Sequence, residues 1–114
     1  MKEQRAPPPA PAGAPLKLSE RQKKFLRARA HALKPVIRLG NAGVSAAISL
    51  EAARALLDHE LIKVKGPAGD RAARDELFAA LARETGSALV HRIGNVAVLY
   101  RPHPELPRIL IPDA

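Results

Sequence analysis

Residues 34–65 read KPVIRLGNAGVSAAISLEAARALLDHELIKVK, and this stretch decides the fold. The run at 35–39 is short, apolar and β-branched and ends at Gly40, which predicts a strand. The run at 46–58 repeats its apolar residues at helical spacing and predicts a helix. Residues 61–65 (LIKVK) predict a second strand, in which Lys63 and Lys65 alternate with Ile62 and Val64. A helix between two strands implies a crossover connection.

The flanking segments supply two more helices. Ser19, with Gln22 three residues later, has the pattern of a capping box and predicts a helix to about Ala32. Asp70 can cap a third helix, and Gly86 is placed to end it.

The last elements complete the expected sheet. Residues 88–93 and 96–100 are β-type runs separated by Gly94-Asn95, which is a strong hairpin signal. The sequence therefore predicts a single α/β domain, ordered α-β-α-β-α-β-β, with three helices and a four-stranded mixed sheet. Ser45 or Asn41 can cap the second helix. The expected core stripes of the second and third helices are Ile48, Ala52, Ala55 and Leu56, and Ala73, Leu77, Phe78 and Leu81.

Length and composition narrow the class. The chain has 114 residues, no cysteine and only three aromatic side chains. This length allows one domain, whose core must be built from Leu, Ile, Val and Ala. Without cysteine, the sequence excludes disulfides, thiolate zinc sites and a cysteine nucleophile. No apolar run is long enough to span a membrane.

Prolines mark both ends of the chain. Of the 11 prolines, five lie in residues 1–15 and four in 102–112. We expect a disordered Pro/Ala-rich arm over residues 1–16, the folded domain over 17–102 and a flexible Pro-rich tail over 103–114. The arm lacks the apolar region of a secretory signal, and its prolines disfavour a transit helix, so we expect a cytoplasmic protein.

The net charge of +8 is concentrated near the N-terminus. Residues 1–43 hold ten basic and two acidic residues, whereas residues 44–114 hold nine of each. A localised positive field suits a polyanion, most often a nucleic acid and less often an anionic membrane. A basic tail that only maintains solubility is the alternative, but most of this charge lies beyond the arm.

Two periodic patterns place the basic residues on common faces. On a helical wheel, Lys23, Lys24, Arg27 and His31 share one arc with Glu20, which suits phosphates but also fits an ordinary solvated face. The opposite, apolar arc of this helix comprises Phe25, Leu26, Ala28, Ala32 and Leu33, with Arg29 as an exception that must reach out or pair with a carboxylate. At period two, Lys63 and Lys65 share one sheet face, which is also typical of an exposed edge strand.

The tetrapeptide Gly40-Asn41-Ala42-Gly43 lies between a predicted strand and a predicted helix. Glycines let the backbone approach a ligand and adopt positive φ, and the following helix N-terminus favours a phosphate. KH domains use a G-x-x-G loop in this way to hold single-stranded nucleic acid. A plain turn also explains the tetrapeptide, but Lys34 and Arg38 precede it directly.

Catalytic and metal-binding patterns are weak. The histidines show no metal-ligand spacing, and His59 lies near the core stripe of the second helix, where a structural role is expected. Asp75-Glu76 has the pattern of a solvated pair on a helix. We therefore expect no enzyme, no metal, no cofactor and no small-molecule substrate.

Collinear blocks of this sequence resemble the CRM (chloroplast RNA splicing and ribosome maturation) domain and its bacterial YhbY-like RNA-binding members. The blocks are LSERQKKFL (18–26), AHALKPVIRLGNAGV (30–44), HELIKVK (59–65), RETG (83–86), IGN (93–95) and VLYRP (98–102). Together they cover about residues 17–102. The resemblance implies a fold like the C-terminal domain of translation initiation factor three. It also implies RNA binding through the G-x-x-G loop and, by analogy, a role in assembly of the large ribosomal subunit.

The sequence thus predicts a monomeric RNA-binding protein whose partner is ribosomal RNA in large-subunit precursors. Two alternatives stay open: a general nucleic-acid-binding protein, and a protein-interaction module that uses the Pro-rich arm. The predicted RNA-binding residues are Lys23, Lys24, Arg27, His31, Lys34, Arg38, Gly40, Asn41, Ala42, Gly43, Lys63 and Lys65.

Overall fold

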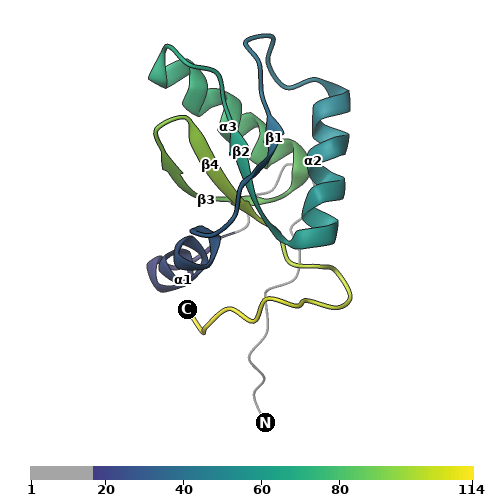
Figure 1. Ribbon diagram of the computed structural model, residues 1–114. Helices are drawn as coiled ribbons and strands as arrows, with labels where there is room; N and C mark the ends of the chain where they lie inside the picture. The colour runs from purple at the N-terminus through teal and green to yellow at the C-terminus, as the bar shows by residue number, and fades with distance from the viewer. Residues whose placement is uncertain (1–16) are drawn as a thin grey trace.

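A computed structural model describes residues 17–114 and shows the predicted order of elements (Figure 1). The expected arm at residues 1–16 lies outside the described residues. The elements are α1 (Glu20–Ala30), β1 (Pro35–Arg38), α2 (Ala46–His59), β2 (Leu61–Lys65), α3 (Arg71–Thr85), β3 (Ala88–Ile93) and β4 (Val96–Tyr100).

The four strands form one mixed sheet in the order β1-β2-β4-β3. Strands β1 and β2 are parallel and are joined through the crossover helix α2, whereas β2–β4 and β3–β4 are antiparallel. Strand β2 is therefore an interior strand. This position rules out the explanation of Lys63 and Lys65 as guards of an exposed sheet edge.

Helices cover the two faces of the sheet unequally. Helices α2 and α3 pack on one face, around the buried side chains of Leu56, Ile62, Phe78 and Leu99. Helix α1 packs on the other face and covers only part of it (Figure 1). A second buried cluster lies there, built from Leu26, Ala30, Leu61, Val90, Val98, Tyr100, Ile109 and Ile111.

The predicted helix ends are confirmed. Ser19 and Gln22 form the reciprocal capping box at the start of α1. Of the two possible caps of α2, Ser45 is the one used, because its hydroxyl accepts the Ile48 amide hydrogen. Asp70 caps α3 in the same way, and Gly86 ends that helix in the left-handed conformation.

Five residues expected in the apolar stripes or near the core are exposed. In α1, Ala28 is exposed, because the buried side of the helix is centred on Leu26 and Ala30. Ala32 and Leu33 are exposed because α1 ends at Ala30 and both lie in the segment that follows it. In α3, Ala73 is exposed at the first turn, ahead of the part of the helix that reaches the sheet. His59 is exposed as well, since α2 ends there and the buried residue is Glu60.

The expectation of a flexible C-terminal tail is also wrong, because a buried glutamate fastens that segment to the domain. Glu60 is fully buried and has a φ of 66°, which turns its side chain toward residues 103–109. Its carboxylate accepts hydrogen bonds from the backbone amides of His103, Arg108 and Ile109 at 2.7–2.9 Å. This anchoring lets Ile109 and Ile111 fill the core beneath α1.

Candidate nucleic-acid interface

The basic arc of α1 faces solvent, as predicted. Lys24, Arg27 and His31 are exposed. Lys23 is half-buried and forms an ion pair with Glu20, with 3.6 Å between its amine nitrogen and the carboxylate oxygen. Lys23 is therefore the least available of these four side chains for a phosphate.

Lys63 holds the segment that directly follows α1 against the sheet. Its amine nitrogen donates to the carbonyl oxygens of Leu33 at 3.0 Å and His31 at 3.5 Å. Carbonyl groups at a helix C-terminus lack partners within the helix, so a cation there is favourable. The Lys63 side chain thus serves a structural contact and also adds positive charge beside Arg27 and His31.

A groove of about 390 Å³ separates α1 from the uncovered part of the sheet. Arg27, His31 and Lys63 lie along it together with His91 of β3. Its remaining wall is apolar: Ala30, Pro35, Ile93, Val96 and Val98. Ile93 is 69% exposed at the outer end of the groove. Cations beside an exposed apolar surface can bind the phosphates and the bases of one RNA segment.

His91 belongs to this groove although it was not among the predicted site residues. Partial burial, with the positive charges of Arg27 and Arg92, lowers the pKa of His91 below its ordinary value. This shift favours the neutral imidazole, which can offer both a donor and an acceptor nitrogen. The position of His91 in the groove follows from the sheet register, since His91 lies opposite Val98 next to a β-bulge. The sequence alone does not show this register.

Arg38 and Lys65 continue the positive surface beyond the groove. The two residues pair across β1 and β2, so their side chains lie on the same face of the sheet. This is the face opposite α2, because the intervening Ile37 and Val64 are buried in the cluster beneath that helix. The positive surface therefore extends along β1 toward the loop that follows it.

The loop of residues 40–43 is fixed to the core at its C-terminal end, whereas its first three residues are exposed to solvent. Gly43 has a φ of 97°, which an L side chain rarely adopts, and the next residue, Val44, packs against the core. Asn41 and Ala42 are exposed. Gly40 has no positive φ and open space where a Cβ atom would lie, so the fold requires only the second glycine.

The loop also borders α3 on its other side. Asn41 lines a hollow of about 650 Å³ that includes Arg74 and Arg83 of α3 but also the carboxylates of Asp70 and Glu76. This mixed charge is less favourable to RNA than the sheet face. The sheet side of the loop is therefore the more favourable side for an anionic ligand.

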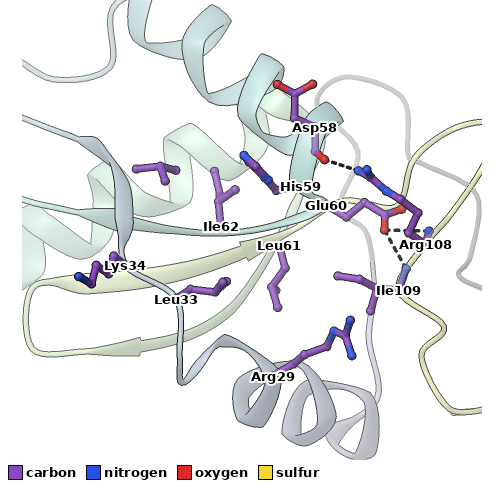
Figure 2. Close-up of a pocket in the computed structure, with 11 residues that line it drawn as sticks. Arg29, Leu33, Lys34, Asp58, His59, Glu60, Leu61, Ile62, Arg108 and Ile109 are labelled. Carbon is purple, nitrogen blue, oxygen red and sulfur yellow. Dashed lines mark hydrogen bonds between the residues drawn. The ribbon is translucent and has the colours of Figure 1, made fainter.

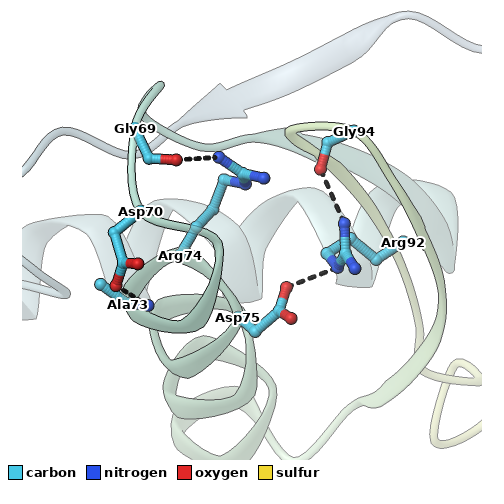
Figure 3. A network of polar contacts seen from close by, with 7 residues as sticks. All are labelled: Gly69, Asp70, Ala73, Arg74, Asp75, Arg92 and Gly94. Carbon is cyan, nitrogen blue, oxygen red and sulfur yellow. Dashed lines mark hydrogen bonds and ion pairs between the residues drawn. The ribbon is translucent and has the colours of Figure 1, made fainter.

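One ion pair and two hydrogen bonds link α3, β3 and the turns beside them (Figure 3). The Asp75 carboxylate pairs with the Arg92 guanidinium, which also donates to the Gly94 carbonyl in the β3–β4 turn. Arg74 donates to the Gly69 carbonyl. Asp75 is therefore ion-paired as well as partly exposed, and Arg92 is occupied at this structural contact.

The predicted site residues do not converge on one point. Helix α1 and the 40–43 loop lie at opposite ends of β1, with Lys63, Lys65 and Arg38 between them (Figure 1). We call this elongated surface the basic track: Lys23, Lys24, Arg27, His31, Lys63, Lys65, Arg38 and residues 40–43. Lys34 is excluded, because it lines a different hollow together with Arg29 and Arg108.

The fold and this surface define a small α/β domain with a helix-covered sheet face and a partly open, basic one. The chain belongs to the CRS1/YhbY (CRM) domain family, whose model matches residues 18–101. It is 46% identical over 88 residues to an RNA-binding protein of Haemophilus influenzae, an alignment that covers 77% of this chain and 89% of the relative.

Two further relatives extend the comparison. The Probable RNA-binding protein YqeI of Bacillus subtilis is 37% identical over 95 residues, which is 83% of this chain and 99% of the relative. The solution structure of a Staphylococcus aureus protein proposed to bind RNA superimposes with a TM-score of 0.74 at 32% identity. That match covers 84% of this chain and all of the other.

Within residues 17–114, no group of three or more His, Cys, Asp or Glu side chains is arranged to hold a metal ion. No helix in the same range has the length and apolar character needed to cross a membrane.

Proposed function

We propose that this protein binds ribosomal RNA in precursors of the large ribosomal subunit and acts there, as a cytoplasmic monomer, in ribosome assembly. The observation that carries the proposal is the basic track, which extends over one sheet face of a domain whose relatives are named RNA-binding proteins. The phosphates would lie along Lys24, Arg27, Arg38 and Lys65, and the 40–43 loop would hold a backbone segment at the far end.

The lack of accessible phenylalanine and tyrosine rings on the track favours recognition of RNA structure rather than of base sequence. Phe25 is half-buried, and Phe78 and Tyr100 are fully buried, so no phenylalanine or tyrosine ring is free to stack on bases along the track. Recognition would therefore depend on phosphate positions, and on the shallow groove beside His31 and His91.

The loop is tested by replacing Asn41 and Ala42 with aspartate. Both residues are exposed, so the protein should stay folded while the added charges repel phosphates. The control is Arg54→Glu on the outer side of α2, which changes the net charge by the same amount. We expect the double variant to lose about tenfold or more in affinity for large-subunit rRNA fragments and the control to lose less than about twofold.

A loop that serves only as a turn would leave the double variant as tight as the control, which would contradict this function for residues 40–43. Sedimentation of cell extracts through a gradient tests the ribosomal partner separately. The protein should move with large-subunit precursors at low salt and leave them at high salt. Equal affinity for duplex DNA, with no cosedimentation, would instead support general nucleic-acid binding.

A further inference from the structure

A second hollow, of about 660 Å³, lies beside the α1–β1 linker (Figure 2). Five segments of the chain meet there. Arg29 comes from α1, Val36 from β1, His59 from the end of α2, Leu61 from β2 and Arg108 from the C-terminal segment. Such a hollow has the size of a small-molecule or single-nucleotide site.

The free charges in this hollow are positive. The Glu60 carboxylate is already satisfied by three backbone amides, and Figure 2 shows the Asp58 carboxylate pointing away from the other lining residues. Arg108 donates to the backbone carbonyl of Asp58. Among residues 17–114, neither Arg29 nor Lys34 has an ion-pair partner, so both remain available to an anion.

The same hollow presents apolar surface and free backbone. Leu33 and Val36 line it and are 37% and 49% exposed, which is high for side chains of this type. Strand β1 is an edge strand, so the backbone groups on its outer side are not paired with another strand. An apolar surface next to unpaired donors and acceptors suits the face and the edge of a nucleobase.

We propose that this hollow binds one unstacked nucleotide of single-stranded RNA, with the phosphates on either side of it at Arg29 and Lys34 and its base over Leu33 and Val36. The inference rests on the proposed RNA-binding function and extends it to a second contact. The α1–β1 linker separates the two surfaces: His31 lines the groove of the basic track, and Lys34 lines the hollow. A strand that crosses this linker therefore reaches both.

Two pairs of variants test the hollow. Val36→Glu places a charge on its apolar wall, and Leu50→Glu places the same charge on an exposed leucine of α2 outside it. Arg29→Gln removes a cation from the hollow, and Arg54→Gln removes one from α2. The probes are a labelled 12-nucleotide single strand of RNA and an RNA duplex, and thermal unfolding verifies that each variant is folded.

We expect Val36→Glu and Arg29→Gln to weaken single-strand binding by about fivefold or more and each control by less than about twofold. Val36→Glu should leave duplex affinity within about twofold, because a paired base cannot enter the hollow. Equal single-strand affinities of Val36→Glu and Leu50→Glu would overturn the proposal. The double variant with aspartate at Asn41 and Ala42 is measured alongside. If it binds RNA weakly while Val36→Glu binds normally, only the hollow proposal fails. If it also binds normally, the proposed function fails as well.

Amide signals of the ¹⁵N-labelled protein identify the occupant directly. Addition of the single strand should shift the signals of Leu33, Val36 and His59. The opposite result has two parts: these signals do not respond to RNA, but they shift when residues 1–16 are removed. It would show that the hollow binds the chain's own arm, and it would overturn the nucleotide assignment.

Discussion

The two glycines of the 40–43 loop have different physical roles. Gly43 has a φ of 97°, so alanine there is strained, whereas Gly40 has open space and no positive φ. We expect Gly43→Ala to lower the free energy of unfolding by about 1–3 kcal/mol in denaturant titrations. Gly40→Ala should leave stability unchanged or slightly higher, because alanine restricts the unfolded chain.

The same pair tests how closely RNA approaches the loop. If the backbone at Gly40 lies against a phosphate, the added methyl group of Gly40→Ala should reduce RNA affinity about fivefold, or about 1 kcal/mol. Unchanged affinity in this stable variant would mean that Gly40 does not contact RNA, and that the loop contact is limited to residues 41–43.

At this scale the sequence predicted the cap residues well, because a cap is a local interaction. It could not reveal Glu60, whose partners lie 43–49 residues further along the chain. A glutamate at the end of a helix normally reads as a solvated residue. Its positive φ and its burial arise from packing of the C-terminal segment, which no local pattern encodes.

Strand β2 joins the fold to the proposed function through two lysines on one face. Lys63 donates to the His31 and Leu33 carbonyls just after α1, whereas within the described chain the Lys65 amine has no hydrogen-bond partner. We expect Lys63→Met to lower the free energy of unfolding by about 1 kcal/mol. Lys65→Met should change it by less than about 0.5 kcal/mol and should reduce RNA affinity.

Denaturant titrations and RNA titrations of both variants measure this difference. A destabilised Lys65→Met, or a Lys63→Met as stable as the wild type, would contradict the structural role assigned to Lys63. The sequence could not predict this structural role of Lys63. The alternation of residues places both lysines on one face of the sheet but does not show which element packs on that face. Only the position of α1 distinguishes them.

Helices and strands were predicted almost completely, because periodicity, caps and the Gly94-Asn95 turn are local signals. The C-terminal segment was not. Its prolines suggested a flexible tail, but Ile109 and Ile111 are buried beneath α1, where each contributes about 1.5–3 kcal/mol of hydrophobic stabilisation. Isolated isoleucines among prolines carry no periodic pattern, so nothing in the sequence marked them as core residues.

For the whole molecule, the fold divides the basic N-terminal region between two surfaces. The excess positive charge lies before residue 44 in the sequence, and from the sequence alone we predicted one binding surface there. Because β1 is at the sheet edge, the linker that precedes it separates the basic track from the hollow around Arg29 and Lys34. The division follows from strand order, which local sequence patterns do not specify.

The central claim is that RNA phosphates lie along the basic track, and the salt dependence of RNA affinity tests it most directly. If five to seven phosphates are bound, log K should fall with log salt at a slope of about −4 to −6. Replacing Lys24, Arg27, Arg38 and Lys65 together with glutamine should make the slope shallower by about 3 while the protein stays folded. A wild-type affinity that hardly changes with salt, or a folded fourfold variant with the wild-type slope, would contradict the account.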